Sequence, residues 1–410
     1  MISSQPYRSR SRLELALLRW SPLLVLFFCL GLILQQPWLV FFSVVVAVII
    51  YLAYLWGAHA LDQVIFHRRW RYRRGFPGEQ FPLKIEVENR KLLPISWLHI
   101  LDPWPMAVGP TDPSVLAPSH IRNLGLLATL CSLRWHERII RSYDLLLRQR
   151  GVYPVGPAAL QSSDLFGLFK TFQEQDTQEY VTVYPELLPL TIPLLPTKDP
   201  FGDRAVRHRL FEDPSRPIGV RPYHPEDEFR RIHWPATARS GSLQAKIYQT
   251  VSARVMMVCL NVSTARAAWL GIDNDMIEQL VKVSATVVYQ SMQSGYAVGL
   301  MSNGCLAHAD HPFQIQPGRT TNQLAYLLQT LAAVTPYTTA AFENYLVKAL
   351  PRITYGASLV IVTALVTSSL VETLFRLKRY RTNTTLISLE TTSPPTIPGV
   401  RSLHMPFYEQ

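Results

Sequence analysis

Residues 255–262 read Val-Met-Met-Val-Cys-Leu-Asn-Val, and this stretch decides the fold class of the C-terminal part of the chain. An almost uninterrupted apolar run of this length is typical of a β-strand that is covered on both faces. Comparable runs occur at 296–301, 359–365 and 385–389, and the last of these is the last predicted strand. The segments between the runs repeat apolar residues at helical spacing. Residues 253–410 are therefore predicted to form a doubly wound α/β domain, with a parallel sheet between layers of helices.

Two helix starts in this region carry capping signals. Asp275 and Glu278 have the spacing of a capping box, which predicts the start of the first helix, and Gly295 predicts its end. Thr320 and Gln323 have the same spacing before a second helical pattern. Both helices are thus expected to begin within a residue or two of these polar side chains.

The N-terminal part contains two apolar runs, at about 15–34 and 38–56, that are separated by Gln35-Gln36-Pro37. Each run is near the ~20 residues that a helix needs to cross a ~30 Å hydrocarbon layer. Residues 1–60 are therefore predicted to form a transmembrane helical hairpin. A cleavable signal peptide is the alternative for the first run, but the second run follows at once without a small-residue cleavage site.

The net charge of +11 belongs mostly to the flanks of this hairpin. Residues 1–20 carry four arginines and one glutamate, residues 57–75 carry five arginines and one aspartate, and residues 21–56 carry no charge. Seven of the eleven net positive charges therefore flank the predicted hairpin. Because positively charged flanks stay in the cytoplasm, they predict that both termini and the soluble domains lie there. The remaining charge is too small for an extended basic stripe, so a nucleic-acid partner is not expected.

Residues 61–188 carry signals of short strands. Leu83, Ile85 and Val87 alternate with charged residues, a period of two that buries one face of a strand. We predict a small antiparallel β-sandwich-like domain here. Residues 189–217 hold six prolines and read as a linker or surface excursion.

Residues 218–252 form the most unusual segment, because arginines, aromatic residues, Asp227 and two histidines are packed closely together. Arginine recognises carboxylates and phosphates with two parallel hydrogen bonds, which suggests an anion-binding or partner-docking patch. The alternative is an ion-paired brace at a domain junction, in which Asp227 holds one or two of the arginines. The candidate residues are Arg221, Tyr223, Asp227, Arg230, Arg231, His233, Trp234 and Arg239.

Familiar catalytic signatures are missing from the sequence. It has no GxxxxGK[ST] loop, no GxGxxG after a strand, no GxSxG and no HExxH. The four cysteines are scattered without a CxxC pair, which excludes a cysteine-built zinc site and a disulfide-stapled scaffold. A protein without enzymatic activity is therefore expected.

Several motifs in a fixed order resemble those of one family. They are Arg150-Gly-Val-Tyr, Ser163-Asp-Leu-Phe-Gly-Leu-Phe, Val183-Tyr-Pro, Gly219-Val-Arg-Pro-Tyr, Arg230-Arg-Ile-His-Trp and Thr237-Ala-Arg. Together with the N-terminal apolar pair they resemble a bacterial membrane-anchored family catalogued as domain of unknown function 58, whose C-terminal domain is similar to the von Willebrand factor A fold. The likeness covers nearly the whole chain.

The resemblance implies a multi-pass protein of the bacterial cytoplasmic membrane that works as an interaction or adaptor protein. Members of the family are often paired with MoxR-type AAA+ ATPases and are thought to help assemble or mature other protein complexes. The alternative is a membrane-surface enzyme that acts on an anionic substrate through residues 219–248. Asp227 or His233 would then be the general acid or base, and the arginines would clamp the anion.

The resemblance to the von Willebrand factor A fold also raises the question of a metal site. That fold often places Asp-x-Ser-x-Ser after its first strand, where a carboxylate and two hydroxyls bind a divalent cation. Here the stretch reads Asn261-Val-Ser263-Thr-Ala265. Asn261 lacks the negative charge that a hard cation favours, and Ala265 offers no side-chain oxygen. Asn261 and Ser263 are thus candidates for a degenerate site, and neither a metal nor another cofactor is expected.

Overall fold

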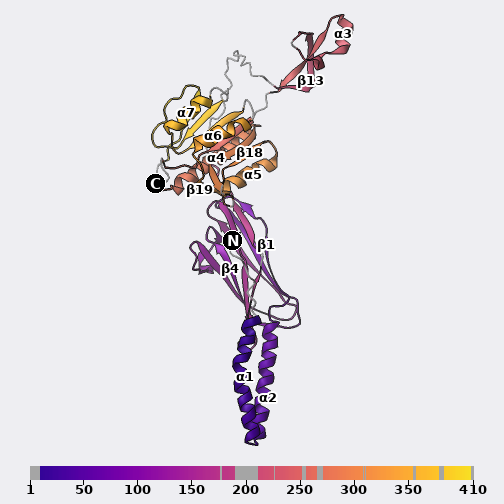
Figure 1. The fold of residues 1–410 in the computed structure, drawn as a ribbon, viewed down its shortest axis with the longest axis vertical. Helices are drawn as coiled ribbons and strands as arrows, with labels where there is room; N and C mark the ends of the chain where they lie inside the picture. Colours follow the sequence, from indigo (N-terminus) through magenta and orange to yellow (C-terminus); the bar gives the residue numbers. More distant parts are fainter. Residues whose placement is uncertain are drawn as a thin grey trace. The chain divides into compact units, whose positions relative to one another are not determined.

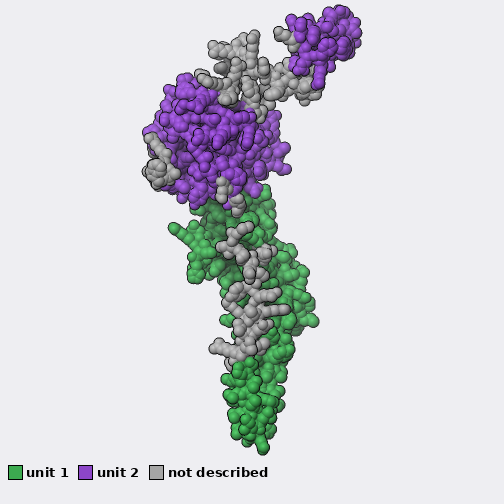
Figure 2. Space-filling view, viewed as in Figure 1, with its two compact units in different colours: residues 1–185 green, residues 186–410 purple. Residues whose placement is uncertain are grey.

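The computed structural model describes residues 10–175, 178–189, 211–225, 227–251, 255–265, 271–307, 309, 311–353, 357–377 and 383–407. The chain forms two compact units, residues 1–185 and residues 186–410, which Figure 2 distinguishes by colour. Figure 1 labels the helices and some of the strands.

The first unit begins with two adjacent helices, α1 (Arg10–Ile33) and α2 (Pro37–Ala58). They come close together at Gly31, where an added Cβ would lie 2.9 Å from Val40 Cγ2. In the part of the chain that the structure describes, one helix, α2, is long and apolar enough to cross a membrane. The described apolar stretch of α1, Ser21–Ile33, is shorter. The predicted pair of spanning helices is therefore supported for one of its two members.

The rest of the first unit consists of strands with a predominantly antiparallel arrangement. Within the described residues the strands form sheets with the orders β1-β3-β8-β5, β11-β10-β4-β7-β6 and β2-β12-β9, and β2 pairs with β12 in parallel. The strands are β1 (Val64–Trp70), β2 (Arg74–Gly75), β3 (Gln80–Asn89), β4 (Ile95–Pro105), β5 (Val108–Pro110), β6 (Leu116–Pro118), β7 (Leu124–Leu133), β8 (Arg138–Leu147), β9 (Gly151–Val155), β10 (Ala158–Ser163), β11 (Lys170–Gln175) and β12 (Glu179–Val183).

One apolar core joins these sheets. Leu83 and Ile85 of β3 are buried in the same cluster as Leu98 and Ile100 of β4, and each of the four is at most 2% exposed. The alternation that the sequence predicted for β3 is present, because its apolar residues point inward at every second position. Burial of several such side chains at about 1.5–3 kcal/mol each is what holds the layers together.

The loop between β10 and β11 fastens the strands to α2. Phe169 is 1% exposed and packs against Ile50, Ala53 and Tyr54, with the Tyr54 and Phe169 rings edge to face at 5.8 Å. The Thr171 hydroxyl donates to the backbone carbonyl of Gly57 at 2.7 Å. The helix and the strand domain are thus packed together as parts of one unit.

The second unit contains a sheet whose described strands have the order β18-β16-β15-β20-β21-β22. β18 is antiparallel to β16, and the other neighbouring pairs are parallel. The strands are β15 (Val255–Leu260), β16 (Ala297–Ser302), β18 (Phe313–Gly318), β20 (Ser358–Thr363), β21 (Thr384–Ser388) and β22 (Val400–His404), and a smaller sheet pairs β17 (Gly304–Leu306) with β19 (Val334–Thr338). The predicted alternation of strands and helices is confirmed.

Helices cover both faces of this sheet (Figure 1). α4 (Asn274–Gln293) packs on one face, where the Ser291 hydroxyl approaches Met256 Sδ at 2.9 Å. α6 (Phe342–Ala349) and α7 (Ser368–Leu377) cover the other face and share a core with Met257 and Cys259. α5 (Thr321–Ala333) lies against α4. Odd and even residues of β15 therefore serve two separate cores.

The helix boundaries test the capping signals. Thr320 caps α5 as predicted, because its side chain accepts from the backbone N–H of Gln323. The prediction for α4 was two residues off, since Asp273 rather than Asp275 caps the helix by accepting from Met276 N–H at 3.0 Å. The strand predicted at 385–389 is present as β21, Thr384–Ser388, but the expectation that it is the last strand was wrong. β22 follows, and the short sequence Val400–His404 contains too few apolar residues to stand out by itself.

Candidate functional site

The segment singled out in the sequence forms a β-hairpin with helical turns at its tip. β13 (Phe211–Pro222) pairs with β14 (Gln244–Val251) in antiparallel fashion, and η2 (Phe229–Arg231) and α3 (Trp234–Ser240) lie between them. Ile232 and Ala245 are at most 2% exposed and pair across a β-bridge. Of the predicted linker, residues 190–210 lie outside the described residues, and residues 211–217 begin β13.

Asp227 organises the turn that follows β13. Its two carboxylate oxygens accept from Arg221 Nη1 and Nη2 at 2.7 and 2.6 Å, and one of them also accepts from the His224 backbone N–H at 3.0 Å. The Tyr223 hydroxyl donates to the Asp227 carbonyl at 3.1 Å. The hydrogen bonds from Arg221, followed by the one from the His224 backbone, lower the pKa of Asp227 to about 2. Asp227 is therefore a fixed carboxylate at neutral pH.

His233 has a local structural partner. It is the N-cap of α3, where its Nδ1 accepts from the Ala236 backbone N–H at 3.0 Å. The Thr237 hydroxyl donates to the His233 carbonyl and accepts from the Gln244 backbone N–H, which attaches the short helix to β14. A histidine in this position contributes to the fold of the segment.

The remaining candidate residues lie toward solvent. Phe229 and Trp234 are 72% and 61% exposed, and Arg230 and Arg239 are also exposed. Arg231 is half-buried. The structure therefore brings Arg221, Tyr223 and Asp227 into one network, places His233 at a helix cap, and displays Arg230, Trp234 and Arg239 on the surface of the segment. Phe229 belongs with them but was not predicted; its place between Asp227 and the paired arginines is the signal that could have shown it.

Asn261 and Ser263 lie at the carboxyl ends of the parallel strands. β15 and β20 are neighbours, but the strand that follows β15 lies toward one edge of the sheet and the strand that follows β20 lies toward the other. Such a switch point is where α/β folds bind ligands. Asn261 Nδ2 donates to Thr363 Oγ1 at 3.0 Å, and Asn261 Oδ1 accepts from the Ser263 backbone N–H at 3.1 Å. Both ends of the Asn261 amide are therefore engaged.

Asn303 completes this arrangement, although the sequence did not single it out. Its Oδ1 accepts from the Val262 backbone N–H at 3.0 Å, and its Nδ2 donates to Ser263 Oγ at 3.2 Å. Asn303 follows β16 just as Asn261 follows β15, and this equivalent place in the next strand is the signal that could have found it. The neutral, mutually bonded groups do not fit a divalent cation, which prefers carboxylate oxygens.

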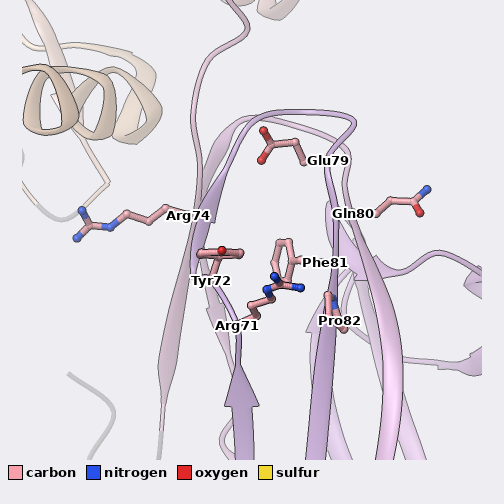
Figure 3. A pocket seen from close by; sticks show the side chains of 7 residues that line it. All are labelled: Arg71, Tyr72, Arg74, Glu79, Gln80, Phe81 and Pro82. Carbon is pink, nitrogen blue, oxygen red and sulfur yellow. The ribbon is translucent and has the colours of Figure 1, made fainter.

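A pocket of about 230 Å³ lies in the first unit and is shown in Figure 3. The Arg71 guanidinium lies 5.6 Å from the centre of the Tyr72 ring, and Glu79 accepts from the Phe76 backbone N–H. Arg74 extends away from Phe81 (Figure 3). The pocket contains none of the predicted site residues. It is lined by Arg71, Tyr72, Arg74, Glu79, Gln80, Phe81 and Pro82.

Three solved structures illustrate the remote likenesses found for this chain. The β-glucosidase from Listeria innocua in complex with isofagomine is 10% identical, with 29% of this chain and 16% of that chain covered and a TM-score of 0.19. The PapD-like domain 7 of human CEP192 is 19% identical, with coverage of 30% and 84% and a TM-score of 0.18. A cohesin module from Clostridium perfringens is 8% identical, with coverage of 30% and 95% and a TM-score of 0.20. At these scores the likenesses carry no argument about fold or function.

Comparison of sequences is more informative. An uncharacterized protein, YeaD, of Bacillus subtilis (strain 168) is 20% identical over 230 residues, which is 55% of this chain and 52% of that protein. The chain thus spans about half the length of this curated relative. The family model described as "Protein of unknown function DUF58" matches residues 219–405, from Gly219 at the end of β13 to Met405 just after β22. The hairpin tip and the α/β sheet therefore lie together in the part of this chain that matches the DUF58 family.

Proposed function

We propose that the chain is a membrane-anchored adaptor that binds other proteins and works with a MoxR-type AAA+ ATPase in the assembly or maturation of protein complexes. The observation that carries the proposal is the tip of the β13–β14 hairpin. It combines exposed aromatic side chains, Phe229 and Trp234, with exposed arginines, Arg230 and Arg239. Tryptophan, tyrosine and arginine are the residue types that contribute most to protein–protein binding energy, and charged surroundings select an acidic partner surface.

The polar residues beneath this surface support binding rather than catalysis. Arg221 holds Asp227 as a carboxylate, and the lowered pKa of about 2 makes this group a poor proton donor at neutral pH. His233 Nδ1 accepts a backbone hydrogen bond within its own helix. In the membrane-surface enzyme considered as the alternative, Asp227 or His233 would have to transfer protons, so the present bonds of both residues favour the adaptor.

The proposal includes the membrane anchor and the fold of the C-terminal domain. We place α1 and α2 across the bacterial cytoplasmic membrane as a pair, with both termini and the soluble domains in the cytoplasm. The apolar length of α2 and the cationic flanks support this topology. We assign residues 253–410 to the von Willebrand factor A type. The place of Asn261 and Ser263 directly after β15, at the switch point of the sheet, supports this assignment.

Site-specific photocrosslinking in intact membranes tests the partner. A photoreactive amino acid replaces Phe229 in one protein and Tyr337, which is 65% exposed in β19, in the control. The expected result is a crosslink from position 229 to a MoxR-type AAA+ ATPase that changes with ATP and is lost when Arg230→Ala and Trp234→Ala are added. Equal crosslinking from both positions, or no ATPase at position 229, would overturn the proposal.

A further inference from the structure

The end of the strand domain that adjoins α2 carries an apolar loop at a defined level along the helix. The loop is Asp164-Leu-Phe-Gly-Leu-Phe169, between β10 and β11. Leu165, Phe166 and Leu168 are 60%, 66% and 41% exposed, whereas Phe169 is buried against α2. Three large apolar side chains in a row of four residues are thus displayed next to a helix that is itself suited to a membrane.

The level of the loop follows from the residues that Phe169 contacts. Ala53 and Ile50 precede the end of α2 at Ala58 by five and eight residues, which at 1.5 Å per residue is about 8 and about 12 Å along the helix axis. α2 has 22 residues and is about 33 Å long, close to the ~30 Å of the hydrocarbon layer. A bilayer that surrounds α2 therefore reaches the level of the loop.

Hydrogen bonds within the loop pair part of its backbone, as a turn near lipid requires. Asp164 is fully buried, and its carboxylate accepts from the Phe166 and Phe169 backbone N–H groups at 2.9 and 2.6 Å. The Gly167 N–H donates to the Asp164 carbonyl at 3.2 Å, and Gly167 takes a positive φ of 72°. These bonds pair three N–H groups of the loop, which lowers the cost of placing the turn near hydrocarbon, where an unpaired group costs several kcal/mol.

A second group of loop tips lies at the very end of α2. Lys91 Nζ donates to the carbonyls of His59 and Ala60, and the Lys91 carbonyl accepts from the His136 backbone N–H. The neighbours of these residues, Leu92 and Trp135, are 77% and 66% exposed. An exposed tryptophan beside an exposed leucine is suited to the headgroup level of a membrane, where aromatic rings are enriched.

We infer that residues 164–169 insert into the lipid bilayer beside α2, with Leu92 and Trp135 at the headgroup level above them. The ligand is the lipid surface itself. The strand domain would then be held to the membrane by its own loops as well as by the helices. This second attachment would fix the orientation of the domain relative to the bilayer as well as its distance from it. This inference rests on the membrane anchor proposed above, and the test must separate the two.

Depth-dependent quenching by brominated lipids provides the test. The full-length protein carries Cys29→Ala and Cys131→Ala, and Cys259 and Cys305 are buried. A fluorophore is attached after one further substitution: Phe166→Cys in the loop, Leu92→Cys at the headgroup level, Val45→Cys in the middle of α2, or Ile121→Cys. Ile121 is 64% exposed and precedes β7, whose opposite end leads to Trp135, so a strand about 30 Å long separates it from the membrane.

In liposomes we expect strong quenching at position 45, clear quenching at 166 at a depth of about 5–10 Å, weak quenching at 92 and none at 121. Quenching at 45 with position 166 no more quenched than 121 would overturn the loop insertion and leave the membrane anchor standing. Absence of quenching at 45 would overturn the anchor, and the loop insertion with it. Each probe replaces an exposed side chain, and all four proteins share the same background, so a difference in quenching between positions reports on depth.

Discussion

Arg68 and Asp102 form a bidentate ion pair in the interior of the strand domain. Arg68 Nε and Nη2 donate to the two carboxylate oxygens of Asp102 at 2.9 and 2.6 Å, and both side chains are 1% exposed. Trp104 Nε1 donates to Asp102 at 2.9 Å, and Arg68 Nη1 reaches Glu179 at 3.4 Å. Because the three charged residues belong to β1, β4 and β12, one network connects the three sheets.

Removing one member of this pair should be far more costly than removing both. Asp102→Ala leaves Arg68 buried without its main partner, and we expect the free energy of unfolding to fall by about 3–5 kcal/mol. The double variant Arg68→Met, Asp102→Leu replaces the pair with apolar side chains and should lose much less. Denaturant unfolding of the detergent-solubilised protein, followed by tryptophan fluorescence, measures both. Equal losses in the single and double variants would contradict this account.

Asp227→Asn should loosen the tip of the β13–β14 hairpin. The substitution removes the charge that Arg221 neutralises, so amide hydrogen exchange should become faster around His224 at pH 7. Asp227 has a lowered pKa, so its contribution is present above the ordinary aspartate value near 3.9 and is lost as the pH falls through about 2. Glu228→Gln changes the charge at the exposed neighbouring position and serves as the control, with exchange expected to match the parent.

Lys91 should make the stability of the first unit rise with pH in the alkaline range. Burial lowers the pKa of Lys91 to about 8, so the unfolded chain binds more protons than the folded one between about 8 and the ordinary value near 10.4. We expect the denaturation midpoint to increase from pH 7.5 to 9.5, and Lys91→Met to abolish most of this increase. Lys84→Met, at an exposed position of β3, should leave it intact. A pH response that survives Lys91→Met would assign it to other groups.

Introducing an acidic residue at the switch point should create cation binding. Asn261→Asp with Ala265→Ser adds one carboxylate and one hydroxyl to the Ser263 hydroxyl already present after β15. Mn²⁺ titration monitored by electron paramagnetic resonance should show a bound ion that the parent lacks. Without metal this variant should be about 1–3 kcal/mol less stable, because Thr363 loses the amide donor of Asn261. Mn²⁺ binding by the parent at the same affinity would refute the degenerate site.

Local signals in the sequence predicted the elements well. Thr320 and Gly295 mark helix ends through hydrogen bonds and a positive φ within one turn of the chain, so no distant contact is needed to interpret them. The apolar run at 255–262 identified a buried strand because both of its faces had to be covered. The capping residue of α4 was misplaced because Asp273 and Asp275 are chemically equivalent, and only the path of the chain before the helix selects between them.

Part of the candidate site could also be predicted from local signals in the sequence. Arg221 and Asp227 are six residues apart within one turn, so their pairing was among the alternatives that the sequence raised. Thr363 is 102 residues from its partner Asn261, and Asn303 is 41 residues from its partner Val262. These contacts depend on which strands become neighbours in the sheet.

The sequence by itself determined the apolar helix α2, the alternation of strands and helices and most of the element boundaries, because these depend on composition and on hydrogen bonds within a few residues. The tertiary structure alone decided that Arg68 meets Asp102, that Asn261 meets Thr363 and that Phe169 packs on α2. Such contacts depend on strand order and register. The same local sequence patterns are compatible with many strand orders, and only the packing of the whole core selects one of them.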